Sequence, residues 1–153
     1  MRTISISISL WFKLMKGLRR RGSGIRESGG FLLCNPGKNK VVKIVFYDQF
    51  DKSVSESGII QFKGAATFFE YLAKEKLEVL ADIHTHPTHN TRQSNSDMKH
   101  PMVRIKGHIA IIAPNYAKDL FISPKQCSVY EYMGNFDWEK FQISKFPIHL
   151  NLI

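Results

Sequence analysis

The first part of the chain changes its spacing of apolar and polar positions from a strand-like to a helix-like period. Residues 3–9 alternate Ile with Ser, and a period of two predicts a strand. Apolar residues then recur every three or four positions over residues 10–21, which predicts a short helix, interrupted at Gly17 and ending near Gly22. The apolar run at residues 29–35 begins with two glycines and predicts a buried strand.

Further along the chain the pattern predicts one long amphipathic helix and several more strands. Val, Ile and aromatic residues are concentrated in residues 41–50, which predicts a strand. Helical spacing of apolar residues predicts a helix over residues 64–76. Residues 77–87 predict a strand that Pro87 must end, because proline cannot donate to a strand ladder. Beyond it we expect a loop at residues 88–93 and a short helix at residues 94–100. Two strands should follow at residues 107–114 and 128–134, and a tail, residues 136–153, should pack back on the sheet.

This order of elements predicts an α/β or α+β fold, a mixed central β-sheet flanked by helices. The chain has 153 residues, which fits one domain over residues 1–153 with a core of its own. Its composition, 43% hydrophobic and 23% charged, is that of a globular protein. We therefore expect neither a disordered chain nor one that crosses a membrane.

Much of the net charge of +9 lies in one basic cluster. Its members are Lys16, Arg19, Arg20, Arg21 and Arg26. Such a cluster could contact nucleic acid or an acidic protein surface. Cations also suit the C-terminus of a helix, however, and a solvated helix end is the interpretation that we favour. Nucleic acid is accordingly not the expected partner, and whether Arg19–Arg21 bind another partner stays open.

The two cysteines and the N-terminal segment both indicate a cytoplasmic protein. Cys34 and Cys127 form neither a C-x-x-C pair nor a disulfide framework, so we expect two small buried residues in a reducing compartment. Residues 1–16 contain an apolar run, but it alternates Ile with Ser and no A-x-A cleavage site follows, which is unlike a signal peptide.

Residues 81–101 combine several groups that could bind a metal ion. His84 and His86 are two positions apart on the predicted strand, so their side chains point to the same face. Zn²⁺ prefers His nitrogens and carboxylate oxygens in a tetrahedral arrangement. Asp97, eleven residues beyond His86, is the best candidate for a third ligand. Ser94 and Asp97 also form a helix-capping pattern, and such a cap would fix where Asp97 points.

The other histidines have simpler explanations. We expect His89 to be solvated in its loop and His100 to cap the end of the short helix, where a cation is favourable. His108 opens a buried strand, so we expect it to be hydrogen-bonded in the core. His149 lies in the predicted tail, and its position indicates no particular role.

The stretch HTHPTHNTRQSNSD resembles the signature H-x-H-P-x(6)-S-x-x-D of the JAB/MPN-plus (JAMM) zinc metallopeptidases. That family also has a glutamate before a glycine-rich strand start, and RESGGFLL places Glu27 two residues before Gly29. The resemblance covers about residues 25–115. Two departures are Cys34, where many relatives have glycine, and the lack of the long insertions that give some relatives their linkage choice.

The resemblance implies both an architecture and a set of residue roles. The fold would be the JAB/MPN, cytidine-deaminase-like architecture. His84, His86 and Asp97 would bind Zn²⁺. Glu27 would be the general acid/base that holds the zinc water, and Ser94 would supply the hydroxyl that helps to stabilise the oxyanion.

The resemblance further implies a zinc isopeptidase that cleaves a ubiquitin-like protein from its conjugates or processes its C-terminus. The bacterial-type pattern suggests an operon with E1-like and E2-like enzymes, and several such operons serve antiviral defence. Three alternatives stay open: a peptidase that trims sulfur-carrier proteins, a DNA-associated JAB-domain protein, and a scaffold that has lost its metal. Barrel amidohydrolases also use H-x-H, but their fold needs about 250 residues. Cupins have few helices, and the helix at residues 64–76 fits them poorly.

Overall fold

A mixed sheet forms the centre of the protein, as the sequence predicts, and it has six strands. The computed structural model describes residues 3–55, 62–119 and 121–152. The strand order is β3-β2-β4-β5-β6-β7, in which β4 and β5 run parallel and the other neighbours are antiparallel. The strands are β2 (Gly29–Cys34), β3 (Lys43–Phe46), β4 (Glu78–Thr85), β5 (Ile109–Ala113), β6 (Ser128–Gly134) and β7 (Asp137–Lys140).

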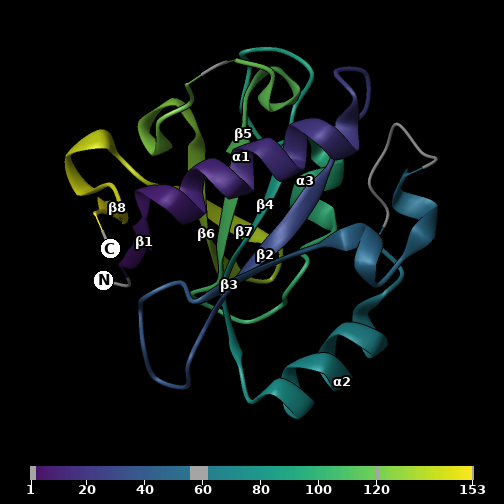
Figure 1. Cartoon of the computed structure of the whole chain (residues 1–153). Helices are drawn as coiled ribbons and strands as arrows, with labels where there is room; N and C mark the ends of the chain where they lie inside the picture. Colours follow the sequence, from purple (N-terminus) through teal and green to yellow (C-terminus); the bar gives the residue numbers. More distant parts are fainter. Residues whose placement is uncertain (1–2, 56–61, 120, 153) are drawn as a thin grey trace.

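Two helices cover opposite faces of this sheet, and a third lies near the end of β4. They are α1 (Ile8–Gly22), α2 (Ala65–Glu75) and α3 (Asn95–Lys99). Leu32 and Cys34 of β2 belong to the core beneath α1, whereas Phe31 and Leu33 pack with Phe68 of α2. All six residues of β2 are buried because both of its faces are covered, which explains the continuous apolar run in its sequence. In Figure 1, α1 crosses in front of the sheet.

The N-terminal strand is shorter than predicted, and the helix after it is longer. β1 spans Ile4–Ser7 and α1 begins at Ile8, because the Ser7 hydroxyl accepts a hydrogen bond from the backbone N–H of Leu10 and caps the helix. The predicted interruption at Gly17 is wrong. A Cβ atom at Gly17 would lie 2.2 Å from the ring of Phe46, so glycine serves here to let that ring pack against an unbroken helix. The predicted end near Gly22 is correct.

The strand predicted over residues 41–50 is also shorter, and the tail divides between two sheets. The chain leaves β3 after Phe46 and enters a 3-10 turn, where the Gln49 side chain accepts the N–H of Phe46 at 2.6 Å. In the tail, β7 extends the main sheet and β8 (Ile148–Asn151) pairs in parallel with β1. β1 and β8 therefore lie side by side although they come from opposite ends of the chain (Figure 1). The 3-10 helices are η1 (Tyr47–Gln49), η2 (Lys52–Ser55), η3 (Asn115–Ala117), η4 (Pro124–Gln126) and η5 (Ile143–Lys145).

The cysteines and the basic cluster lie where the sequence places them. Cys34 and Cys127 are buried free thiols, and burial raises the pKa of Cys127 to about 12, so this thiol stays protonated. Arg19–Arg21 form the last turn of α1. Arg21 donates to Asp48 at 3.0 Å, with its guanidinium 3.7 Å from the centre of the Phe46 ring. In the part of the chain that the structure describes, no helix is both long and apolar enough to cross a membrane.

Candidate metal centre

His84 and His86 converge at the end of β4, although only the first belongs to the strand. The predicted strand to Pro87 ends at Thr85, and His86 follows it. The extended path nevertheless continues for one residue, because the N–H of His86 donates to the carbonyl of Ala113 in β5 at 2.8 Å. The two side chains therefore stay on the same side, and their Nε2 atoms lie 3.2 Å apart.

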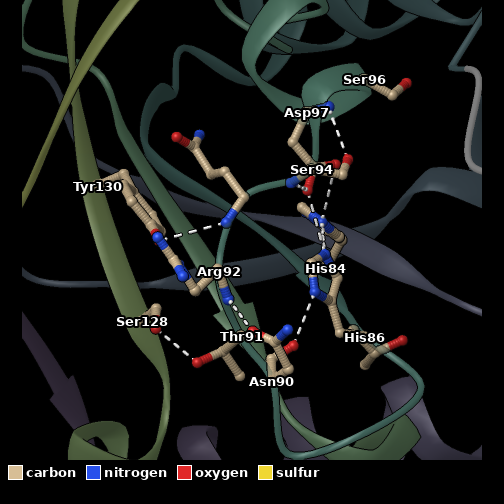
Figure 2. A network of polar contacts seen from close by, with 12 residues as sticks. His84, His86, Asn90, Thr91, Arg92, Ser94, Ser96, Asp97, Ser128 and Tyr130 are labelled. Carbon is tan, nitrogen blue, oxygen red and sulfur yellow. Dashed lines mark hydrogen bonds and ion pairs between the residues drawn. The ribbon is translucent and has the colours of Figure 1, made fainter.

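Asp97 reaches the two histidines because a capping box fixes the start of α3. The N–H of Asp97 donates to the Ser94 hydroxyl at 3.0 Å, and the N–H of Ser94 donates to Oδ2 of Asp97 at 2.8 Å. Each side chain thus satisfies a backbone donor that the first helical turn leaves without a partner. The predicted cap is present, and it holds the Asp97 carboxylate next to the imidazoles (Figure 2).

The three groups form a triangle of ligand atoms. Nε2 of His84 lies 3.3 Å from Oδ1 of Asp97, and Nε2 of His86 lies 3.1 Å from Oδ2. Tetrahedral zinc with bonds of about 2.0–2.1 Å holds its ligand atoms roughly 3.3 Å from one another. Each histidine thus lies at about this distance from one of the two carboxylate oxygens, and one ligand atom of each residue lies within 4.8 Å of the others, so the donor set could hold Zn²⁺.

Burial and mutual contacts give these groups unusual proton affinities. Burial opposes ionisation of Asp97, but hydrogen bonds from His84 and His86 and from the backbone N–H of Ser94 outweigh it, so the pKa of Asp97 lies far below its ordinary value. Burial lowers the proton affinity of His86, but contacts with Asp97 and with the carbonyl of Asn90 prevail and raise its pKa above 6.5. Asp97 is thus an anion across the neutral range, as a metal ligand must be.

Glu27 comes from the loop between α1 and β2, and a pair of hydrogen bonds holds it beside the histidines. The N–H of Ser28 donates to the Thr85 hydroxyl and the N–H of Thr85 donates to the Ser28 carbonyl, both at 2.9 Å. Because Thr85 separates the two histidines and Ser28 follows Glu27, these bonds bring the glutamate to the triangle. Burial raises the pKa of Glu27 above 4.5, although the charges of His84 and His86 act in the opposite direction.

A surface pocket of about 660 Å³ opens at this point. Its lining includes all five residues that the sequence singles out, which are Glu27, His84, His86, Ser94 and Asp97. The volume is within the range of about 300–1,000 Å³ that ligand-binding pockets have. The structure thus brings the five residues together, and their chemical roles stay predictions.

Asp82 and Trp138 are among the residues of this pocket that the sequence patterns did not indicate. Asp82 lies two positions before His84 and lines the pocket, and it accepts a hydrogen bond from His108 at 2.6 Å in a buried pair. Asp82 and His84 are two positions apart on one strand, so their side chains share a face, and this spacing could have indicated Asp82 from the sequence. Trp138 comes from β7, forty residues beyond Met98 of α3, and no local pattern connects it with the site.

The remaining histidines lie as expected. His108 is buried and hydrogen-bonded in the core. His100 is the C-terminal cap residue of α3, with Nδ1 2.9 Å from the carbonyl of Ser96. His89 is exposed in the loop.

Comparison with known proteins agrees with the site. Residues 14–122 match the family described as prokaryotic homologs of the JAB domain. The chain belongs to this family. The matched residues of the JAB domain include Glu27, the histidine pair, Ser94 and Asp97.

Solved structures share the fold at low sequence identity. A protein from Desulfitobacterium hafniense has a TM-score of 0.64 and 15% identity, over 97% of this chain and 92% of that one. A JAB1/MPN domain protein from Archaeoglobus fulgidus has a TM-score of 0.55 and 14% identity, over 96% and 98%. A structure described as JAMM, a metalloprotease-like zinc site in the proteasome and signalosome, has a TM-score of 0.52 and 14% identity, also over 96% and 98%. The JAB/MPN architecture that the sequence predicts is therefore confirmed.

Proposed function

We propose that this JAB-domain protein is a zinc-dependent isopeptidase. The observation that carries the proposal is the triangle of His84, His86 and Asp97 beside the half-buried carboxylate of Glu27. The three ligand atoms supply one negative charge and two neutral nitrogens, a set typical of catalytic zinc sites, which leave a fourth position open.

Hydrolysis of an amide requires a better nucleophile than water and a proton for the departing amine. Zn²⁺ held by the three residues would supply a Lewis acid and would lower the pKa of a bound water from 15.7 to about 7. Glu27 would accept a proton as water adds to the carbonyl carbon. It would then pass that proton to the nitrogen as the C–N bond breaks. Its raised pKa suits both halves of this transfer, since a carboxylate that ionises too readily returns a proton poorly.

Ser94 has a hydroxyl proton available for the developing oxyanion. The Ser94 oxygen accepts a hydrogen bond from the N–H of Asp97, and this bond leaves the hydroxyl proton of Ser94 free to donate. Ser94 is exposed and lines the pocket, so its O–H can turn towards a substrate carbonyl. Loss of a comparable oxyanion donor costs about 10²–10³ in rate.

The substrate that we propose is a ubiquitin-like protein, joined through its C-terminal glycine to a lysine or to another chain. The resemblance to JAMM peptidases supports this choice, and the pocket opens to the surface, as cleavage of a folded conjugate requires. The partners would then be E1-like and E2-like enzymes encoded nearby, with antiviral defence as the setting. An extended tail would bind by backbone pairing along a strand edge.

A panel of substrates tests this function. The zinc-loaded protein is incubated with ubiquitin-like proteins fused linearly or through a lysine, with and without a chelator. We expect cleavage after the terminal glycine, abolished by the chelator and restored by added zinc. Removal of one terminal residue alone would instead favour the trimming of sulfur-carrier proteins. No cleavage of any member by fully zinc-loaded protein would contradict the isopeptidase.

A further inference from the structure

A C-terminal hairpin borders the metal centre and lies beyond the residues that match the JAB family. It consists of β6 and β7, whereas the matched residues end at 122. Three hydrogen bonds connect it to the segment that carries Asp97. They join Thr91 to Ser128 through their hydroxyls, the N–H of Gln93 to the Tyr130 hydroxyl at 3.2 Å, and Nε1 of Trp138 to the carbonyl of Met98 at 3.1 Å. Figure 2 shows Ser128 and Tyr130 on the strand that faces the loop.

Trp138 is the principal contact between β7 and the metal centre. It is half-buried, while the other three residues of β7 are exposed, so this strand contributes one inward side chain. Its ring packs on Tyr132 with centroids 4.9 Å apart. Its indole N–H donates to the carbonyl of Met98, which directly follows Asp97. That carbonyl lies in the last turn of a helix, where carbonyls have no partner within the helix.

α3 depends on such outside contacts for its position. It has five residues and none of them is buried. A helix of this length is far below the roughly 12–15 residues at which isolated helices become even marginal in water. The capping box fixes its first turn and Trp138 holds its last turn. Asp97 belongs to the capping box and directly precedes Met98, so its carboxylate can move if the bond from Trp138 is lost.

We propose that the β6–β7 hairpin is a positioning element of the metal centre, with Trp138 as its main residue and Tyr130 as its second. Trp138 holds α3 through the Met98 carbonyl, and Tyr130 holds the loop before α3 through the N–H of Gln93. Together they keep Asp97 at the distance from His84 and His86 that one ion requires. This inference rests on the proposed zinc site and goes beyond it, because neither residue is a ligand.

Trp138→Phe removes the indole N–H and keeps an aromatic ring, and Tyr130→Phe removes the hydroxyl. The matched control is Trp11→Phe. The indole of Trp11 also donates to a backbone carbonyl, that of Ile122 at 2.6 Å, but Trp11 lies on the buried face of α1 and does not line the pocket. For each protein, the zinc dissociation constant is measured by competition with a chromophoric chelator. The visible spectrum of the Co²⁺-loaded form reports the ligand geometry, and thermal unfolding reports stability.

We expect Trp138→Phe to weaken zinc binding about 10-fold, the lower end of the 10–100-fold losses typical of groups that orient ligands. Its Co²⁺ spectrum should change, and Tyr130→Phe should act in the same direction. Trp11→Phe should lower the melting temperature and leave affinity and spectrum as in wild type. Unchanged zinc affinity and spectrum in both hairpin variants would overturn the inference. An equal loss of zinc affinity in Trp11→Phe would also overturn it. If the wild-type protein itself bound no zinc, the proposed function would fail, and this result is distinguishable from the other two.

Discussion

Ser28 and Thr85 are hydrogen-bonded to each other in both directions, with each backbone N–H donating across 2.9 Å. Thr85 separates the two histidines of the metal centre, and Ser28 follows Glu27. Both residues are buried, with Thr85 0% and Ser28 4% exposed, so water does not compete for these bonds. One reciprocal contact therefore fixes the position of the proposed acid/base relative to the proposed ligands.

Thr85→Val tests this relationship, because valine has nearly the shape of threonine but lacks the acceptor. The buried N–H of Ser28 would lose its partner, which costs about 1–3 kcal/mol of folding stability. We expect slower peptide cleavage with zinc content unchanged, since Glu27 moves while the ligands remain. Thr85→Ser keeps the hydroxyl and should retain most of the activity. Denaturant unfolding, zinc analysis and cleavage rates measure these effects, and a valine variant as active and as stable as wild type would contradict the assignment.

Glu27→Gln separates metal binding from catalysis. Glutamine has the same shape but cannot carry the proton, and general acid–base catalysis contributes about 10²–10⁴ in rate. We expect a full complement of zinc and a loss of at least about 100-fold in turnover. Cleavage at the wild-type rate would show that another group performs the proton transfer.

The same substitution should stabilise the metal-free protein. Burial raises the pKa of Glu27 in the folded state, so ionisation costs folding stability once the pH exceeds 4.5. Glutamine avoids this cost. In chelator, Glu27→Gln should therefore melt at a higher temperature than wild type at pH 7, and the difference should vanish as the pH falls below 4.5. Calorimetry across this range measures it. Glu70→Gln, on the exposed side of α2, serves as the control and should leave the melting temperature unchanged.

Asp97 has two separable tasks, as a proposed ligand and as half of the capping box. Asp97→Ala removes both and should lose zinc together with about 1 kcal/mol of stability, the typical value of a helix cap. Asp97→Asn keeps an oxygen that accepts the N–H of Ser94, so it should weaken zinc binding with little loss of stability. Zinc analysis and unfolding of both variants distinguish the tasks. Wild-type zinc affinity in Asp97→Ala would remove Asp97 from the metal centre.

The parts of this site that local sequence spacing determines could be predicted. The two histidines converge because residues two apart on an extended chain share a face, and Asp97 points at them because a Ser-x-x-Asp cap sets its orientation. Trp138 could not be found, since its contact with Met98 joins positions forty residues apart. The prediction that Gly17 interrupts the helix is wrong for a related reason. The ring of Phe46, which requires a glycine at this position, comes from β3, far along the chain.

Diffraction at the zinc absorption edge from crystals grown with Zn²⁺ tests the central claim most directly. We expect one anomalous peak about 2.0–2.2 Å from Nε2 of His84, Nε2 of His86 and a carboxylate oxygen of Asp97, with the Glu27 carboxylate facing the remaining coordination position. A peak bound by other residues, or Glu27 turned away from the ion, would contradict the proposed hydrolase.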